Sequence, residues 1–130
     1  MVNYGKYIKI NRYLQKKSIS ELCDGICTPS TLSKIENNKS NINPKIINQI
    51  LERLSNINID ILEANTNRLK PLKELFIQRL MLNLDRSDLM AKIEKEQSNY
   101  LHSEYILFFY IAKLFSNFDL YHINNQDIDE

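Results

Sequence analysis

The sequence contains few of the residues that form turns: two glycines and three prolines in 130 residues. Glycine and proline most often end helices and shape β-turns, so their scarcity favours long helices and few β-turns. Hydrophobic residues make up 43% and charged residues 25%, which is typical of globular proteins. A chain of this length can bury one core, or one small domain and part of another. We therefore expect an all-α fold.

Cysteine is also scarce. The two cysteines, Cys23 and Cys27, are four residues apart, and His102 and His122 lie far from them in the sequence. A zinc site needs four ligands, and the sequence has no second cysteine pair or nearby histidine to complete one. We expect two buried, reduced thiols, and we predict neither a metal nor a cofactor.

Long apolar runs are absent as well. The longest, from Tyr105 to Ala112, is far shorter than the ~20 residues that span a bilayer, and no signal peptide is visible at the N-terminus. There is no glycine-rich phosphate loop, no paired histidine and carboxylate, and no base beside either cysteine. We expect a cytoplasmic protein that has no membrane partner and is not an enzyme.

The net charge of +1 hides an uneven distribution. Residues 1–55 carry nine Lys/Arg and four Asp/Glu, a balance of +5, whereas residues 56–130 carry eight and twelve, a balance of −4. A basic front half and an acidic back half are typical of a nucleic-acid-binding module joined to a region that does not touch DNA, although chance in a short chain is the alternative.

One segment of the basic half has the pattern of a DNA-recognition helix. Thr28 followed by Pro29 marks a helix start, because a threonine hydroxyl caps the first turn and proline fits the first helical position. The pair Asn37–Asn38 marks the end. Leu32 and Ile35 would face the core, which leaves a small, hydroxylated outer face with one cation. The residues expected to contact DNA on this face are Thr28, Ser30, Thr31 and Lys34.

Further polar residues flank this helix. Lys17, Asn38 and Lys39 occupy the positions where phosphate contacts are expected, and an ordinary solvated surface is the alternative. The segment 18–24 before it begins with a capping box, Ser18 with Glu21, and Gly25 ends it. Two short helices joined by a tight, glycine-containing turn form a helix-turn-helix.

The remaining helices of the first half follow from apolar spacing. The first is expected from Tyr4 to about Lys16, with Tyr4, Tyr7, Ile8 and Leu14 on its buried face. A fourth begins at Asn43-Pro44 and runs to about Ser55. A short fifth helix around residues 57–62 would close the core. These five helices predict a domain of residues 1–66.

This arrangement resembles the lambda-repressor-like, xenobiotic-response-element type of DNA-binding domain. The matching residues are Gly5, Ile8, Arg12, Leu22, the run Leu32–Glu36, Pro44, Ile50 and Leu54. They cover about half of the chain. The turn Gly25–Thr28 is one residue shorter than the usual family pattern and looks like that of Rgg-type, peptide-responsive regulators of Gram-positive bacteria.

The resemblance also implies roles for particular residues. In that family the residues at the places of Arg12 and Glu36 commonly pair, so Glu36 would be structural and would not repel DNA. Two positions depart from the pattern. Ile19 stands where a glutamine often contacts DNA, and Asn11 stands where the family often has leucine.

Residues 67–130 are expected to form a second helical region, with helices at 68–83, 87–97 and 103–117. Ser87 is the expected cap of the second. The third is apolar nearly all round between Tyr105 and Phe115, so it should be covered on both sides. Antiparallel helices of this kind are similar to the start of a tetratricopeptide-like array. Rgg-type regulators carry such an array, which binds a short peptide and dimerises.

These observations predict a sequence-specific transcriptional regulator that binds double-stranded DNA as a homodimer on a palindromic operator. Residues 67–130 would be the dimerisation or sensor region, either the start of a longer helical-repeat domain or a compact cap. Two alternatives stay open. One is a protein-interaction module whose helix-turn-helix has lost DNA binding, and the other is a regulator whose second half binds a short signalling peptide.

Overall fold

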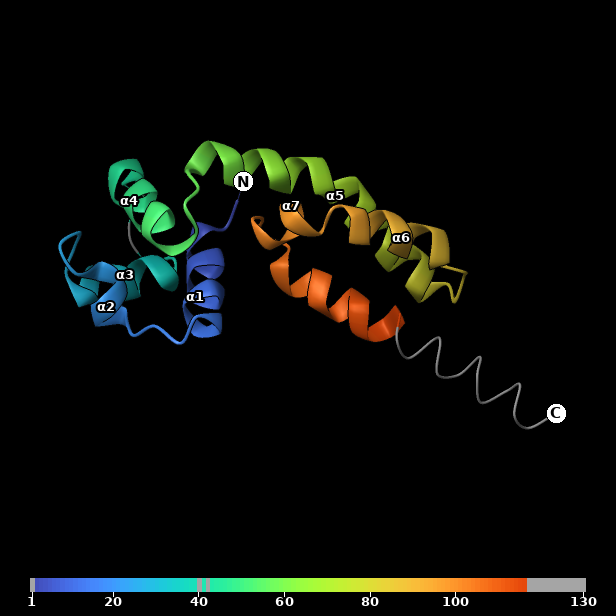
Figure 1. Ribbon diagram of the computed structural model, residues 1–130, viewed down its shortest axis with the longest axis horizontal. Coiled ribbons are helices and arrows are strands. Elements are labelled where there is room, and N and C mark those ends of the chain that lie inside the picture. The colour runs from blue at the N-terminus through green and yellow to red at the C-terminus, as the bar shows by residue number, and fades with distance from the viewer. Residues whose placement is uncertain (1, 40, 42, 117–130) are drawn as a thin grey trace. The chain divides into compact units, whose positions relative to one another are not determined.

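The computed structural model describes residues 2–39, 41 and 43–116, and every regular element within these ranges is a helix (Figure 1). The all-α prediction is confirmed. The chain divides into two compact units. The N-terminal unit comprises residues 1–67 and 102–104, and the C-terminal unit comprises residues 68–101 and those from Tyr105 on.

The N-terminal unit contains four complete helices and the start of a fifth. They are α1 (Tyr4–Leu14), α2 (Ile19–Cys23), α3 (Pro29–Glu36), α4 (Pro44–Ser55) and the first part of α5 (Ile59–Met81). Four of these begin at polar caps, and at the first of them Asn3 accepts from the Lys6 amide at 2.9 Å. The side-chain oxygens of Ser18, Thr28 and Asn43 accept hydrogen bonds from backbone amides in the first turns of α2, α3 and α4. The helix starts predicted from these residues are confirmed.

Two of these helices, α1 and α3, end in Schellman motifs, each at a left-handed residue. Lys16 has φ 55°, and the amide of Lys17 donates to the Arg12 carbonyl at 3.0 Å. Asn38 has φ 56°, and the amide of Lys39 donates to the Lys34 carbonyl at 2.8 Å. Both are Schellman ends. The first ends α1 at Leu14, two residues before the predicted end.

The core of this unit is built from apolar residues of all five helices. Its buried members are Val2, Tyr4, Tyr7, Ile8, Leu22, Cys23, Leu32, Ile35, Ile47, Ile50, Leu51, Leu54, Ile57 and Leu62. Leu14, predicted to be buried, is 54% exposed. At 100° per residue, Leu14 lies about a quarter turn from the centre of the buried face of α1. Asn11 and Arg12 lie on that buried face instead. The Asn11 side chain donates to the Tyr7 carbonyl at 3.0 Å, which satisfies the polar group in this core.

The prediction of a short fifth helix and a separate helix at 68–83 is wrong. A single helix, α5, runs from Ile59 to Met81 and contains Pro71. The sequence between Leu62 and Arg68 has no glycine or proline, so nothing there ends the helix. Pro71 has no N–H to donate to the carbonyl of Asn67. The boundary between the two units follows Asn67 directly.

The C-terminal unit contains the rest of α5, α6 (Ser87–Lys95), α7 (Gln97–Leu101) and a last helix of residues 106–116. Its buried apolar residues are Leu69, Phe76, Leu89, Met90, Ile93, Tyr100, Phe109 and Ala112. The predicted end of the last helix at Asn117 lies outside the described residues. The last helix was predicted to be covered on both sides; within the described residues of one chain only one of its faces is buried, so the chain itself does not cover the other.

The start of α6 also differs from the prediction. Ser87 is its first residue and not its cap. The carboxylate of Asp85 accepts from both the Ser87 amide, at 3.1 Å, and the Ser87 hydroxyl, at 3.0 Å. These hydrogen bonds lower the pKa of Asp85. Asp85 thus binds the first turn of α6 from the position before the N-cap residue, which is Arg86.

Candidate nucleic-acid interface

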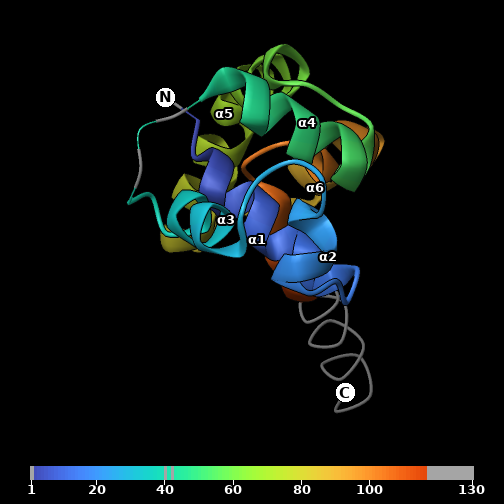
Figure 2. The same ribbon diagram turned by 90° about the vertical axis from the view of Figure 1, so that its left-hand side faces the viewer.

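The candidate interface is built on α2 and α3, which are in contact with each other and are both labelled in Figure 2. The Ser18 hydroxyl accepts from the Glu21 amide at 3.1 Å and starts α2. The chain then turns through Gly25, whose φ of +75° favours glycine, while the Cys27 amide donates to the Cys23 carbonyl at 3.0 Å. The turn brings Thr28 to the start of α3. A helix-turn-helix results.

Arg53, from the last turn of α4, holds this turn in place. Its guanidinium donates to the Leu22 carbonyl at 3.0 Å and also to the Asp24 carbonyl. These two oxygens belong to the end of α2, where a helix leaves carbonyls without intrahelical partners. Sequence analysis missed Arg53, because a basic residue in the last turn of a helix looks the same whether it is solvated or bound to another helix end.

Arg53→Ala is expected to lower the free energy of unfolding by about 1–2 kcal/mol, since it removes two charge-assisted hydrogen bonds at a partly exposed site. Urea denaturation followed by circular dichroism measures this loss. Lys45→Ala, at an exposed position near the other end of α4, is the matched control and should change stability by less than about 0.5 kcal/mol. Equal midpoints for the two variants would contradict the role of Arg53.

The inner side of α3 is held by a buried ion pair to α1. Arg12 donates from Nε to Glu36 Oε2 at 2.8 Å and from Nη2 to Glu36 Oε1 at 2.9 Å. Its Nη1 donates to the Lys17 carbonyl at 3.0 Å. The hydrogen bond with the Glu36 carboxylate raises the pKa of Arg12. The carboxylate is therefore neutralised inside the protein and lies away from the exposed face of α3.

The exposed face of α3 carries the residues predicted to contact bases. Ser30 and Lys34 are exposed and one turn apart, and Thr31 is half-buried beside them. The Thr28 hydroxyl is already used: it accepts from the Thr31 amide at 3.1 Å and lies 2.8 Å from the Thr31 hydroxyl. Thr28 is therefore the cap of α3, and Ser30 and Lys34 are the side chains on this face most available to a ligand.

The predicted phosphate contacts lie at two ends of this scaffold. Lys17 is half-buried at the entrance to α2, and its carbonyl is held by Arg12. Lys39 is exposed just after α3. The Asn38 side-chain oxygen lies close to α1, 2.9 Å from where a Cβ on Gly5 would stand. Asn38 thus contributes to the contact between α1 and α3, a role that its place in the sequence does not reveal.

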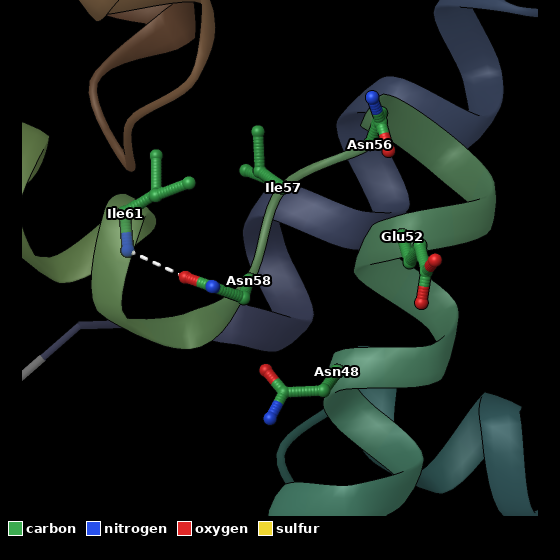
Figure 3. A pocket seen from close by; sticks show the side chains of 6 residues that line it. All are labelled: Asn48, Glu52, Asn56, Ile57, Asn58 and Ile61. Carbon is green, nitrogen blue, oxygen red and sulfur yellow. Dashed lines mark hydrogen bonds between the residues drawn. The ribbon is translucent and has the colours of Figure 1, made fainter.

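A separate hollow of about 330 Å³ lies at the corner between α4 and α5 (Figure 3). Its lining residues are Asn48, Glu52, Asn56, Ile57, Asn58 and Ile61. Two of the polar groups serve the start of α5, because Asn48 accepts from the Ile59 amide and Asn58 from the Ile61 amide, both at 2.9 Å. This corner shapes the helix junction and does not include α3.

Other kinds of site find no support in the described part of the chain. Within it, no group of three or more His, Cys, Asp or Glu side chains is arranged to hold a metal ion. Cys23 and Cys27 are free thiols, but the prediction that both are buried is wrong, because Cys23 is buried and Cys27 is only half-buried. This partial burial raises the pKa of Cys27. Among the helices that the structure describes, none combines the length and apolar character needed to cross a membrane.

Comparison with known families agrees with this geometry. Residues 8–62 match the helix-turn-helix family, a family of DNA-binding regulator domains and not of enzymes. No curated protein and no solved structure gives a significant match. The match does not distinguish the Rgg type, so that part of the resemblance stays a prediction. The match covers less than half of the chain: residues 8–62 are similar to the helix-turn-helix family in its lambda-repressor-like form, and this similarity suggests a DNA-binding transcriptional regulator.

Proposed function

We propose that this regulator binds a palindromic operator as a homodimer, with one α3 in each of two major grooves. The observation that supports this best is the exposed face of α3, where Ser30, Thr31 and Lys34 lie on a helix anchored from both sides by Arg12 and Arg53. Hydroxyls and a lysine of this spacing can hydrogen-bond base edges. Two-fold symmetry would place half-sites about 34 Å apart, or at a multiple of that distance.

The residues that flank α3 would fix the position of each subunit along its DNA half-site. Lys17 and Lys39 would neutralise phosphates, and Asn38 would contact a phosphate while it supports α1. The excess of positive charge in residues 1–55 supports this orientation, because it places attraction for DNA on the helix-turn-helix half of the chain. Such a regulator would act in the cytoplasm. The domains of residues 1–66 and 67–130, and a peptide ligand for the second, stay proposals.

The test is selection of bound duplexes from a random DNA library. The wild-type chain is expected to enrich a palindrome. Lys34→Ala/Thr31→Ala is expected to lose at least about 30-fold in affinity for it, as each of the two base contacts contributes about 1–3 kcal/mol. Lys70→Ala is the matched control, because it removes an exposed lysine from the C-terminal unit and should keep the wild-type consensus.

The outcomes separate base contacts from simple charge attraction. Weak, salt-sensitive retention without a consensus, equal in all three proteins, would overturn site-specific binding by α3. It would favour the alternative in which the helix-turn-helix has lost DNA binding. Thermal melting of each variant shows that the fold is kept.

A further inference from the structure

The last helix, residues 106–116, has two apolar faces, of which the protein covers one (Figure 1, orange). Ile106, Phe109 and Ala112 are buried in the core of the C-terminal unit. The opposite face carries five large apolar side chains that are exposed. They are Leu107 (44%), Tyr110 (42%), Ile111 (50%), Leu114 (67%) and Phe115 (39%). These five residues are called the apolar stripe below.

We propose that the apolar stripe is the surface through which two copies of this chain associate, helix against helix. The proposal deepens the proposed function, on which it rests for its biological use, because two linked helix-turn-helix units are what a palindrome requires. A two-fold contact brings the same patch of each copy together. One self-complementary surface on the chain is therefore sufficient to form a dimer.

The spacing within the apolar stripe fits a partner helix. Leu107, Ile111 and Leu114 are separated by four and then three residues, which is the spacing of the seam between two packed helices. A seam of this kind needs a second helix with the same repeat, and a second copy of the chain supplies one.

Charge does not oppose the contact. Between Tyr105 and Ser116 the sequence has one charged residue, Lys113. Its ammonium lies 5.6 Å from the centre of the Phe109 ring, on the side of the helix that faces the core. Two stripes can therefore meet without burying a charge, which would be costly unless it were paired.

The exposed area is sufficient for a reversible dimer. If a large apolar side chain offers about 200 Å², the exposed fractions of the five residues amount to roughly 500 Å² per copy. Two copies would bury about 1,000 Å², near the lower limit for a specific interface. Exposed apolar patches larger than a few hundred Å² are rare on proteins that stay monomeric.

Sedimentation velocity of the full chain, from about 1 to about 200 μM, tests the proposal. The wild type is expected to change from monomer to dimer within this range. Leu114→Lys should weaken the dimer by at least about tenfold, because it places a charge in the seam. Ile111→Lys should do the same and serves as a second variant if the first is unstable.

Met81→Lys is the matched control. Met81 is 80% exposed and lies at the end of α5, outside the apolar stripe, so its substitution should leave the dimer unchanged. A wild type that stays monomeric at every concentration would overturn the proposal, as would a dimer that both stripe variants leave intact. DNA selection separates the two proposals: a dimer that enriches a palindrome but that both stripe variants leave intact contradicts this inference alone, and a dimer that the stripe variants dissociate but that enriches no sequence contradicts only the proposed function.

Discussion

Arg12→Ala is expected to lower the free energy of unfolding by about 3–5 kcal/mol, because it leaves the Glu36 carboxylate buried without its counter-charge. The Arg12 and Glu36 side chains are only 9% and 2% exposed, so water cannot replace the lost partner. The substitution also removes the hydrogen bond to the Lys17 carbonyl and the contact with the Tyr13 ring, 4.6 Å away. Urea denaturation at neutral pH measures the change.

Two further variants show whether the uncompensated charge is the cause. Arg12→Met/Glu36→Leu removes both charges and should cost less than Arg12→Ala, since no carboxylate is left unpaired. Arg68→Ala breaks the pair with Glu96, in which the arginine side chain is 65% exposed, and should cost less than about 1 kcal/mol. A loss as small for Arg12→Ala as for Arg68→Ala would contradict the burial argument.

The pair also shows what the sequence could predict about the site. Capping residues act within three or four positions of themselves, so Ser18, Thr28 and Asn43 marked the helix starts correctly. The Arg12–Glu36 contact spans 24 residues, and only the family resemblance suggested it. Local patterns thus located α3, while the contacts that orient it depend on tertiary packing.

Arg53 and Asn38 illustrate the limit of local patterns. Arg53 binds carbonyls 29 and 31 residues away, and no spacing rule connects an arginine to the end of another helix. Asn38 was expected to contact a phosphate because it follows the recognition helix. Its left-handed backbone is a local feature of the helix end, but its place against α1 depends on how α1 and α3 cross.

The errors in the second half of the chain have a different origin. Apolar periodicity fades between Leu62 and Arg68, and this fading suggested a break that α5 does not have. Apolar periodicity shows which side of a helix is buried. Its loss marks the end of a helix only when a helix-breaking residue or a cap is also present. The apolar stripe is the converse case. Its apolar residues predict that this face is buried. The surface that buries it can belong to another molecule, and a single sequence does not identify that molecule.

Gly5→Ala is expected to destabilise the protein by about 2–4 kcal/mol, although the same change in an open helix would stabilise it by about 0.5–1 kcal/mol. A Cβ at this position would stand 2.2 Å from the Ile35 carbonyl oxygen and 3.1 Å from that of Glu36. Backbone atoms at the end of α3 cannot rotate away as a side chain can. The helices α1 and α3 would therefore have to separate, which would also move the recognition helix.

Gly25→Ala separates this effect from the loss of a glycine as such. Nothing lies within 4 Å of a Cβ at Gly25, so the only expected cost is that of its positive φ, about 1–2 kcal/mol. Urea midpoints of the two variants, with DNA affinity measured on the same samples, test the comparison. If Gly5→Ala unfolds at the same midpoint as the wild type or a higher one, the close approach of α1 to the end of α3 is wrong. A midpoint well below that of Gly25→Ala would show that Gly5 is required because two helices touch there, and not because a turn needs it.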